Sequence, residues 1–157
     1  QLGSGTWDLK PSLTWLGLSG DWSYGSQVSA VLHLDENDNG YTLGDSAMLT
    51  GWLNRRINQW SAVSLRLTGK SWGNVDGRDD EMPVIPMGPL AGQPVAGAVD
   101  PDARGGSRLD LSLGLSLWDT ETGARFAVEA GAPVYQNLDG PQLGTEWFLS
   151  AGVQIAW

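Results

Sequence analysis

The sequence predicts an all-β protein, and more closely an antiparallel transmembrane β-barrel of the kind found in the bacterial outer membrane. Three features favour this fold: apolar residues recur at every second position, the alternating segments are long, and short and long connections alternate. The clearest segment is SRLDLSLGLSLWD, residues 107–119, in which leucine alternates with polar residues or glycine. Because successive side chains on a strand point to opposite faces, this segment has one apolar and one polar face.

Seven segments follow this pattern, and each is 12 to 16 residues long. Strands in soluble domains are most often about 5–6 residues long, whereas a tilted strand needs about 9–11 residues to cross a bilayer. The lengths therefore favour membrane-spanning strands over those of a soluble domain. In chain order the expected strands are Thr6–Leu18, Asp21–Leu34, Tyr41–Arg56, Ser61–Gly73, Ser107–Trp118, Ala124–Tyr135 and Thr145–Trp157.

The apolar rows are expected to face lipid, with aromatic residues at both ends of the hydrocarbon band. The last strand shows this best, since its apolar row begins at Trp147 and ends at Trp157. A similar row runs from Phe126 to Val134 in the strand before it. The predicted lipid-facing residues are Leu109, Leu111, Leu113, Leu115, Leu149, Val153 and Ile155, and the predicted aromatic girdle is Trp7, Trp22, Trp147 and Trp157.

The opposite rows carry charges of both signs, separated by Gly, Ser and Thr. In a barrel these rows line a water-filled lumen, and in a soluble sandwich they would simply contact solvent. The number and length of the strands favour the lumen. The predicted lumen-lining residues are Arg66, Lys70, Arg108, Asp110, Arg125, Glu129 and Glu146.

The connections also match a barrel, which has short periplasmic turns and long outer loops. Short connections alternate strictly with longer ones, and the segment 74–106 is predicted to be a long extracellular loop. The longer connections have net charges of −3, −4 and −1, so they hold −8 of the net charge of −9. The short connections are Ser19–Gly20, Ile57–Trp60 and Asp119–Gly123, and the long ones are Asp35–Gly40, Asn74–Gly106 and Gln136–Gly144.

Composition excludes several other classes. The chain of 157 residues is long enough for one domain, 1–157, and has no cysteine for disulfides or thiolate metal sites. It has no run near the ~18 apolar residues of a membrane-spanning helix. The net charge of −9 argues against nucleic acid as a partner, because phosphate binding needs a basic surface.

Three segments resemble a proteobacterial outer-membrane family of transporters, in the group named for the MetA-pathway of phenol degradation. They are PVYQNLDGPQLGTEWFLSAGVQIAW (Pro133–Trp157), QLGSGTWDL (Gln1–Leu9) and ENDNGYTLGD (Glu36–Asp45). The resemblance implies that the chain is the C-terminal portion of a longer barrel, with an amino-terminal half that supplies about five more strands. It also implies that the C-terminal aromatic, here Trp157, is read by the barrel-assembly machinery.

The strand count supports a larger assembly independently, because seven is odd and bacterial single-chain barrels have even numbers. An open sheet would leave two unpaired edges in lipid, where each unsatisfied backbone group costs several kcal/mol. We therefore expect that missing amino-terminal strands, an unrecognised eighth strand or self-association pairs the open edges. The expected partners around the barrel are membrane lipid and lipopolysaccharide.

One loop resembles a calcium site. DENDNG (Asp35–Gly40) matches the first half of an EF-hand loop, with candidate ligands Asp35, Asn37 and Asn39 for Ca²⁺. The twelfth position is Ser46 where a bidentate Glu is required, and strands flank the loop where helices should. Asn-Gly is also a common hairpin turn, so a polar outer loop is the favoured alternative.

The sequence predicts no enzyme, since the single histidine, His33, has no identifiable nucleophile to activate. The first functional hypothesis is an outer-membrane channel or transporter for a small molecule. The alternatives are a secreted β-sandwich that binds carbohydrate or calcium, and a barrel without a pore that has a structural or adhesive role.

Overall fold

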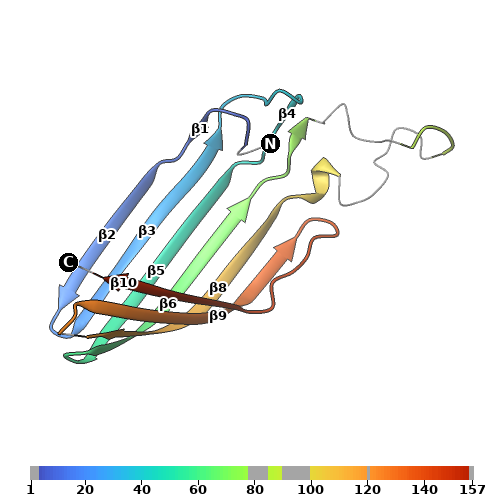
Figure 1. Cartoon of the computed structure of the whole chain (residues 1–157). Helices are drawn as coiled ribbons and strands as arrows, with labels where there is room; N and C mark the ends of the chain where they lie inside the picture. The colour runs from blue at the N-terminus through green and yellow to red at the C-terminus, as the bar shows by residue number, and fades with distance from the viewer. Residues whose placement is uncertain (1–3, 78–84, 90–99, 120, 156–157) are drawn as a thin grey trace.

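The computed structural model describes residues 4–77, 85–89, 100–119 and 121–155, and the described residues form an all-β structure (Figure 1). They contain no α-helix, and no helix among them is long and apolar enough to cross a membrane. The elements are β1 (Asp8–Leu9), β2 (Ser12–Ser19), β3 (Trp22–His33), β4 (Tyr41–Thr42), β5 (Ser46–Asn58), β6 (Ser61–Trp72), β7 (Asp76–Gly77), the 3-10 turn η2 (Pro101–Ala103), β8 (Gly106–Trp118), β9 (Ala124–Leu138) and β10 (Phe148–Ile155).

The long strands form one antiparallel sheet in which neighbours in space follow one another along the chain. Its order is β1-β3-β5-β6-β8-β9-β10, and β2 continues the line of β1 along the same edge of β3. The prediction of long antiparallel strands is confirmed. The sheet is not closed in the described residues, because β2 and β10 each pair on one side only.

The sheet is strongly curved, and β9 and β10 bend across its open side in Figure 1. The curvature places side chains of β3, β5, β6, β8, β9 and β10 around one hollow of about 570 Å³. Two glycines of this sheet lie opposite aromatic residues. Gly25 lies directly opposite Trp52, and Gly131 lies directly opposite Phe148, so each aromatic ring covers a position without a side chain.

Four of the predicted strands have different bounds in the structure. The first is divided into β1 and β2 at Lys10 and Pro11, and the last begins at Phe148. The third long strand begins at Ser46, because Tyr41–Thr42 pairs separately with Asp76–Gly77 and joins two of the long connections. Strand β9 extends to Leu138, beyond the predicted end at Tyr135. The pairing of β4 with β7 involves loop residues without an alternating pattern, so alternation could not predict it.

A bulge in β9 changes the predicted apolar row. Leu109 pairs with Tyr135 and Asp110 pairs with Pro133, which leaves Val134 as the extra residue. The bulge accommodates Pro133, since proline cannot donate to a regular ladder inside a sheet. Tyr135 therefore continues the apolar row where Val134 was predicted.

The short turns lie at one end of the sheet and the long connections at the other (Figure 1). Gly20 lies in the turn between β2 and β3 with φ of 58°, a conformation that favours glycine. At the opposite end, Asn74 holds together the base of the long connection. Its side-chain oxygen accepts from the backbone N–H groups of Arg104 (2.9 Å) and Gly105, and its amide donates to Asp139 at 3.4 Å.

The described residues have almost no apolar interior. Ala103 is their only buried hydrophobic residue, whereas large apolar side chains along the strands are exposed. A soluble β-sandwich would bury such side chains between two packed sheets. The only other sheet in the described part of the chain is the two-stranded pair β4–β7, which is too small for this purpose.

Candidate functional site: the polar concave face

The strand register sorts the side chains onto two faces. Directly paired residues lie on the same face, so Leu53, Leu65, Leu113, Ala130 and Leu149 form one row across five strands. We call this side the convex apolar face. Its opposite, the concave polar face, carries rows such as Asn54, Ser64, Gly114, Glu129 and Ser150.

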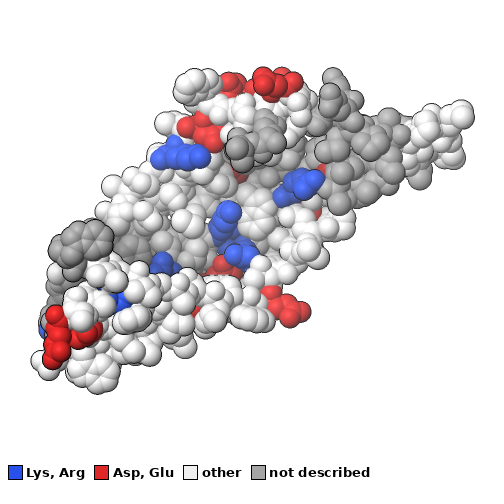
Figure 2. All heavy atoms as spheres, in the orientation of Figure 1, with Lys and Arg blue, Asp and Glu red and all other residues white. Residues whose placement is uncertain are grey.

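The concave polar face holds the hollow of about 570 Å³ and a second one of about 410 Å³ toward the short turns. Arg125 and Ser116 line both hollows, so these residues mark where the two meet. Figure 2 shows Lys and Arg side chains in the hollowed middle of this face, while most acidic side chains lie toward its ends. The face can therefore bring a polar solute into contact with fixed charges along its length.

Arg66 and Glu129 form the central charged contact of this face. Arg66 Nε lies 3.2 Å from Glu129 Oε2, although their strands, β6 and β9, are separated by β8. Ser112 lies between them on β8 and donates its hydroxyl to Glu129 Oε1 at 2.9 Å. The three residues form a polar group across three strands.

Arg108 and Asp110 form a second contact nearer the long connections. Arg108 Nε lies 3.0 Å from both Asp110 carboxylate oxygens, and its Nη1 donates to Thr145 Oγ1 at 2.7 Å. The guanidinium thus links β8 to the segment that precedes β10. Thr145 N also donates to the side-chain oxygen of Gln136 at 3.1 Å, which fixes the same segment against β9.

Two predicted lumen residues have no acidic partner among the described residues. Lys70 lies with its ammonium 5.4 Å from the centre of the Trp72 ring, and it pairs in register with Arg108. Arg125 is exposed, and it donates a long hydrogen bond of 3.4 Å to Ser116 Oγ. Glu146 is exposed just before β10 and also forms no ion pair within the described part of the chain.

The convex apolar face has the predicted composition. All seven residues predicted to face lipid lie on it by register, and six of them are at least 40% exposed. These six are Leu111, Leu113, Leu115, Leu149, Val153 and Ile155, while Leu109 is half-buried.

Exposed aromatic residues lie toward both ends of the strands. Trp7 and Trp147 flank the long connections at 80% and 70% exposure, and Trp22 lies near the short turns. Arg55 lies with its guanidinium 5.2 Å from the Trp22 ring. The fourth predicted girdle residue, Trp157, is outside the described residues. The sequence prediction did not include Trp60 in the aromatic girdle. Trp60 is exposed in a short turn, so only a prediction that considered turn residues could have found it.

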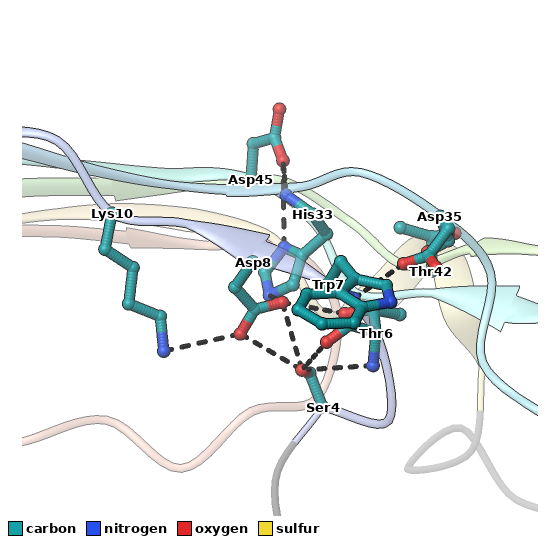
Figure 3. A network of polar contacts seen from close by, with 9 residues as sticks. All are labelled: Ser4, Thr6, Trp7, Asp8, Lys10, His33, Asp35, Thr42 and Asp45. Atoms are coloured by element: carbon teal, nitrogen blue, oxygen red, sulfur yellow. Dashed lines mark hydrogen bonds and ion pairs between the residues drawn. The ribbon is translucent and has the colours of Figure 1, made fainter.

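His33 belongs to a network at the end of the sheet near the long connections (Figure 3). Its imidazole lies between two carboxylates, with Nε2 3.8 Å from Asp8 and Nδ1 3.7 Å from Asp45. Asp8 also accepts from Thr6 and Ser4, which fixes the first residues of the described chain against β3. These contacts give His33, the single histidine of the chain, a structural role at this end of the sheet.

The predicted calcium ligands are engaged with the backbone. Asp35 accepts from Trp7 N at 2.7 Å, and Asn37 accepts from Asn39 N at 3.0 Å and Tyr41 N at 3.3 Å. This is the hydrogen bonding of a polar turn, the favoured alternative for DENDNG. No group of three His, Cys, Asp or Glu side chains in the described ranges could hold a metal ion. The calcium site stays an untested prediction.

At the short-turn end, Asp119 stabilises the connection between β8 and β9. Its carboxylate accepts from Thr122 Oγ1 at 2.7 Å and from Glu121 N at 3.0 Å. The hydroxyl of Thr122 and then the Glu121 N–H hold the pKa of Asp119 below its ordinary value of 3.8.

No protein-family model, curated protein or solved structure matches this chain. The family resemblance of its C-terminal segment therefore stays a prediction, and function has to be argued from the two faces of the sheet.

Proposed function

We propose that this chain forms part of the wall of an outer-membrane β-barrel, and that its concave polar face lines a passage for a small polar molecule. The observation that carries the proposal is the exposed convex apolar face combined with the near absence of an apolar interior in the described residues. Contiguous exposed apolar surface of this extent is typical of a face that contacts lipid or another protein.

The energetic cost of leaving this face in water supports lipid contact. Burying one Leu, Val or Phe side chain contributes roughly 1.5–3 kcal/mol, so ten such residues left about half-exposed in water forgo roughly 8–15 kcal/mol. That is comparable with the whole stability of a typical domain, about 5–15 kcal/mol. Hydrocarbon chains can cover the convex face while the polar face remains wet, which is the arrangement of barrel strands.

Strand direction limits how such a barrel can close. Strands β2 and β10 form the two edges, and both run from the long-connection end to the short-turn end. Pairing them with each other, or with the same edges of a second copy oriented alike, would give parallel neighbours. Antiparallel closure needs an odd number of additional strands, so we propose that a further segment supplies an odd number of strands.

Conductance across a planar lipid bilayer tests the proposed function. Ala127 and Val128 are adjacent in β9 and lie on the concave and convex faces, respectively. In the complete barrel, in which the proposed further segment supplies the missing strands, we expect stepwise conductance, a smaller step for Ala127→Trp, and an unchanged step for Val128→Trp.

The other outcomes point to the alternatives. Refolding to a monodisperse protein without detergent would contradict the barrel and favour a secreted module. Stable membrane insertion without conductance would contradict the passage and favour a structural or adhesive barrel. Equal effects of the two tryptophan variants on the conductance step would contradict the assignment of the concave face to the lumen.

A further inference from the structure

The charges on the concave polar face do not balance. Five basic side chains project from its strands, and three of them have an acidic partner: Arg56 with Asp21 at 2.8 Å, Arg66 with Glu129 at 3.2 Å, and Arg108 with Asp110 at 3.0 Å. The remaining two, Lys70 and Arg125, form no ion pair among the described residues. Glu146, a predicted lumen residue just before β10, is also unpaired among the described residues, so this face has an excess of one positive charge although the whole chain has a net charge of −9.

Arg125 is placed to meet a solute. Its side chain is exposed and lines both hollows, where polar groups of Asn54, Ser64 and Ser116 surround the same space. A guanidinium offers five N–H donors, and one long contact to Ser116 leaves most of them unused by the protein. An anion can accept from these donors without breaking an ion pair.

The nearest acids of the turn leave the donors of Arg125 unused. Asp119 and Glu121 lie between β8 and β9, but neither forms an ion pair with it. The Asp119 carboxylate is instead held by the hydroxyl of Thr122 and the N–H of Glu121. Glu129 is engaged by Arg66 and Ser112.

The acidic long connections are too far away to change this. They begin at the other end of β8, 13 residues long, which spans about 40 Å at a rise of about 3.3 Å per residue. Charges are screened over about 8 Å at physiological ionic strength. The acids of the loops therefore influence the mouth of the passage, where Lys70 also lies, two residues from the end of β6. Arg125 is the second residue of β9, at the opposite end, and it determines the potential there.

We propose that Arg125 is an anion-binding position and that the passage prefers small anions to cations, in spite of the negative net charge of the chain. The selectivity rests on the proposed lumen, whereas the binding position requires only the hollow around Arg125. The expected ligands are small anions with oxygen or halide acceptors, and chloride is the simplest probe.

Two measurements separate the binding position from the passage. Chloride binding to the detergent-solubilised chain is followed by broadening of the ³⁵Cl resonance, which needs no conductance. Arg125→Gln is expected to remove most of the broadening, and the matched control Arg55→Gln, which removes the same charge from the convex face, is expected to keep it.

Ion selectivity is measured from the reversal potential in a KCl gradient across a planar bilayer. The complete barrel is expected to favour Cl⁻ over K⁺, and Arg125→Gln should lower the permeability ratio about twofold, as for one unit charge about 8 Å from each ion in water with screening over the same distance. Arg55→Gln should leave the ratio unchanged.

Each result decides between the claims. Loss of broadening in Arg125→Gln together with a lowered Cl⁻/K⁺ ratio supports both parts. Loss of broadening without any conductance supports the anion position and contradicts the proposed passage. Equal broadening in the wild type and Arg125→Gln, or a preference for K⁺, overturns this inference and leaves the barrel itself in place.

Discussion

Arg66 and Glu129 meet at 3.2 Å across strand β8, which separates their own strands in the sheet. In a flat sheet, side chains two strands apart would be separated by twice the strand spacing, about 9–10 Å. The contact therefore reflects the long reach of both side chains and the curvature that turns their faces toward each other. Ser112 of β8 completes the group by donating to Glu129.

Glu129→Gln is predicted to raise the preference for anions. The change leaves the Arg66 charge uncompensated, while the amide oxygen of glutamine can still accept from Ser112. Because Arg66 is 46% exposed, the ion pair should contribute less than about 1 kcal/mol to stability. Reversal potentials should therefore show an increased Cl⁻/K⁺ ratio at nearly unchanged stability, and a decreased ratio would contradict the assigned lumen.

A charge introduced on the convex face should destabilise the protein, whereas one on the concave face should not. Leu113 is 66% exposed in the middle apolar row, and Leu113→Arg is predicted to cost about 2–4 kcal/mol, as for arginine near the bilayer midplane. Ala127→Arg places the same charge in the polar hollow. Denaturant titrations in lipid vesicles compare the two, and equal losses would show that lipid does not contact Leu113.

Gly25→Ala should destabilise the sheet where Gly152→Ala does not. A methyl group at Gly25 would lie 2.6 Å from Cζ2 of Trp52 and 2.6 Å from the Trp15 carbonyl oxygen, whereas one at Gly152 would have nothing within 4 Å. Overpacking of this kind typically costs about 1–3 kcal/mol. The same titrations provide the measurement, and a neutral Gly25→Ala would mean that Trp52 does not lie across this position.

The turn between β8 and β9 should loosen in acid. The pKa of Asp119 is lowered by Thr122 and the Glu121 N–H, so its contribution to stability is complete above the ordinary pKa of 3.8. That contribution is lost as the pH falls through the lowered pKa of the folded state. Amide hydrogen exchange of residues 121–124 should rise over this range in the wild type, and Asp119→Asn should remove the pH dependence. An unchanged pH profile in that variant would assign the loosening to another group.

Local alternation was sufficient to predict the strands and their faces. The leucine row of residues 107–119 and the row from Leu149 to Ile155 lie on one face in the structure, because period two in a strand fixes side-chain direction directly. The predicted mixed charges of the opposite row are likewise found together. Alternation could not show that Val134 is displaced from the apolar row. The displacement results from the pairing of Pro133 with Asp110, which lies in a neighbouring strand.

The pairing of charges also lay beyond sequence reasoning. Arg66 is 63 positions from Glu129 in the chain, and only the sheet order brings them together. For the same reason the sequence did not distinguish the unpaired Arg125 from the paired Arg108. The Asn74 contacts at the base of the long connection arise in the same way, from residues far apart in the chain.

Contact between acyl chains and the convex face is the central claim, and lipid-attached quenchers test it most directly. The chain has no cysteine, so Leu113→Cys, Val153→Cys and Ala127→Cys can each carry a single fluorescent label. In vesicles with brominated acyl chains, labels at positions 113 and 153 should be strongly quenched, while the label at 127 should respond to a water-soluble quencher. Quenching by lipid at 127 but not at 113 or 153 would contradict the account.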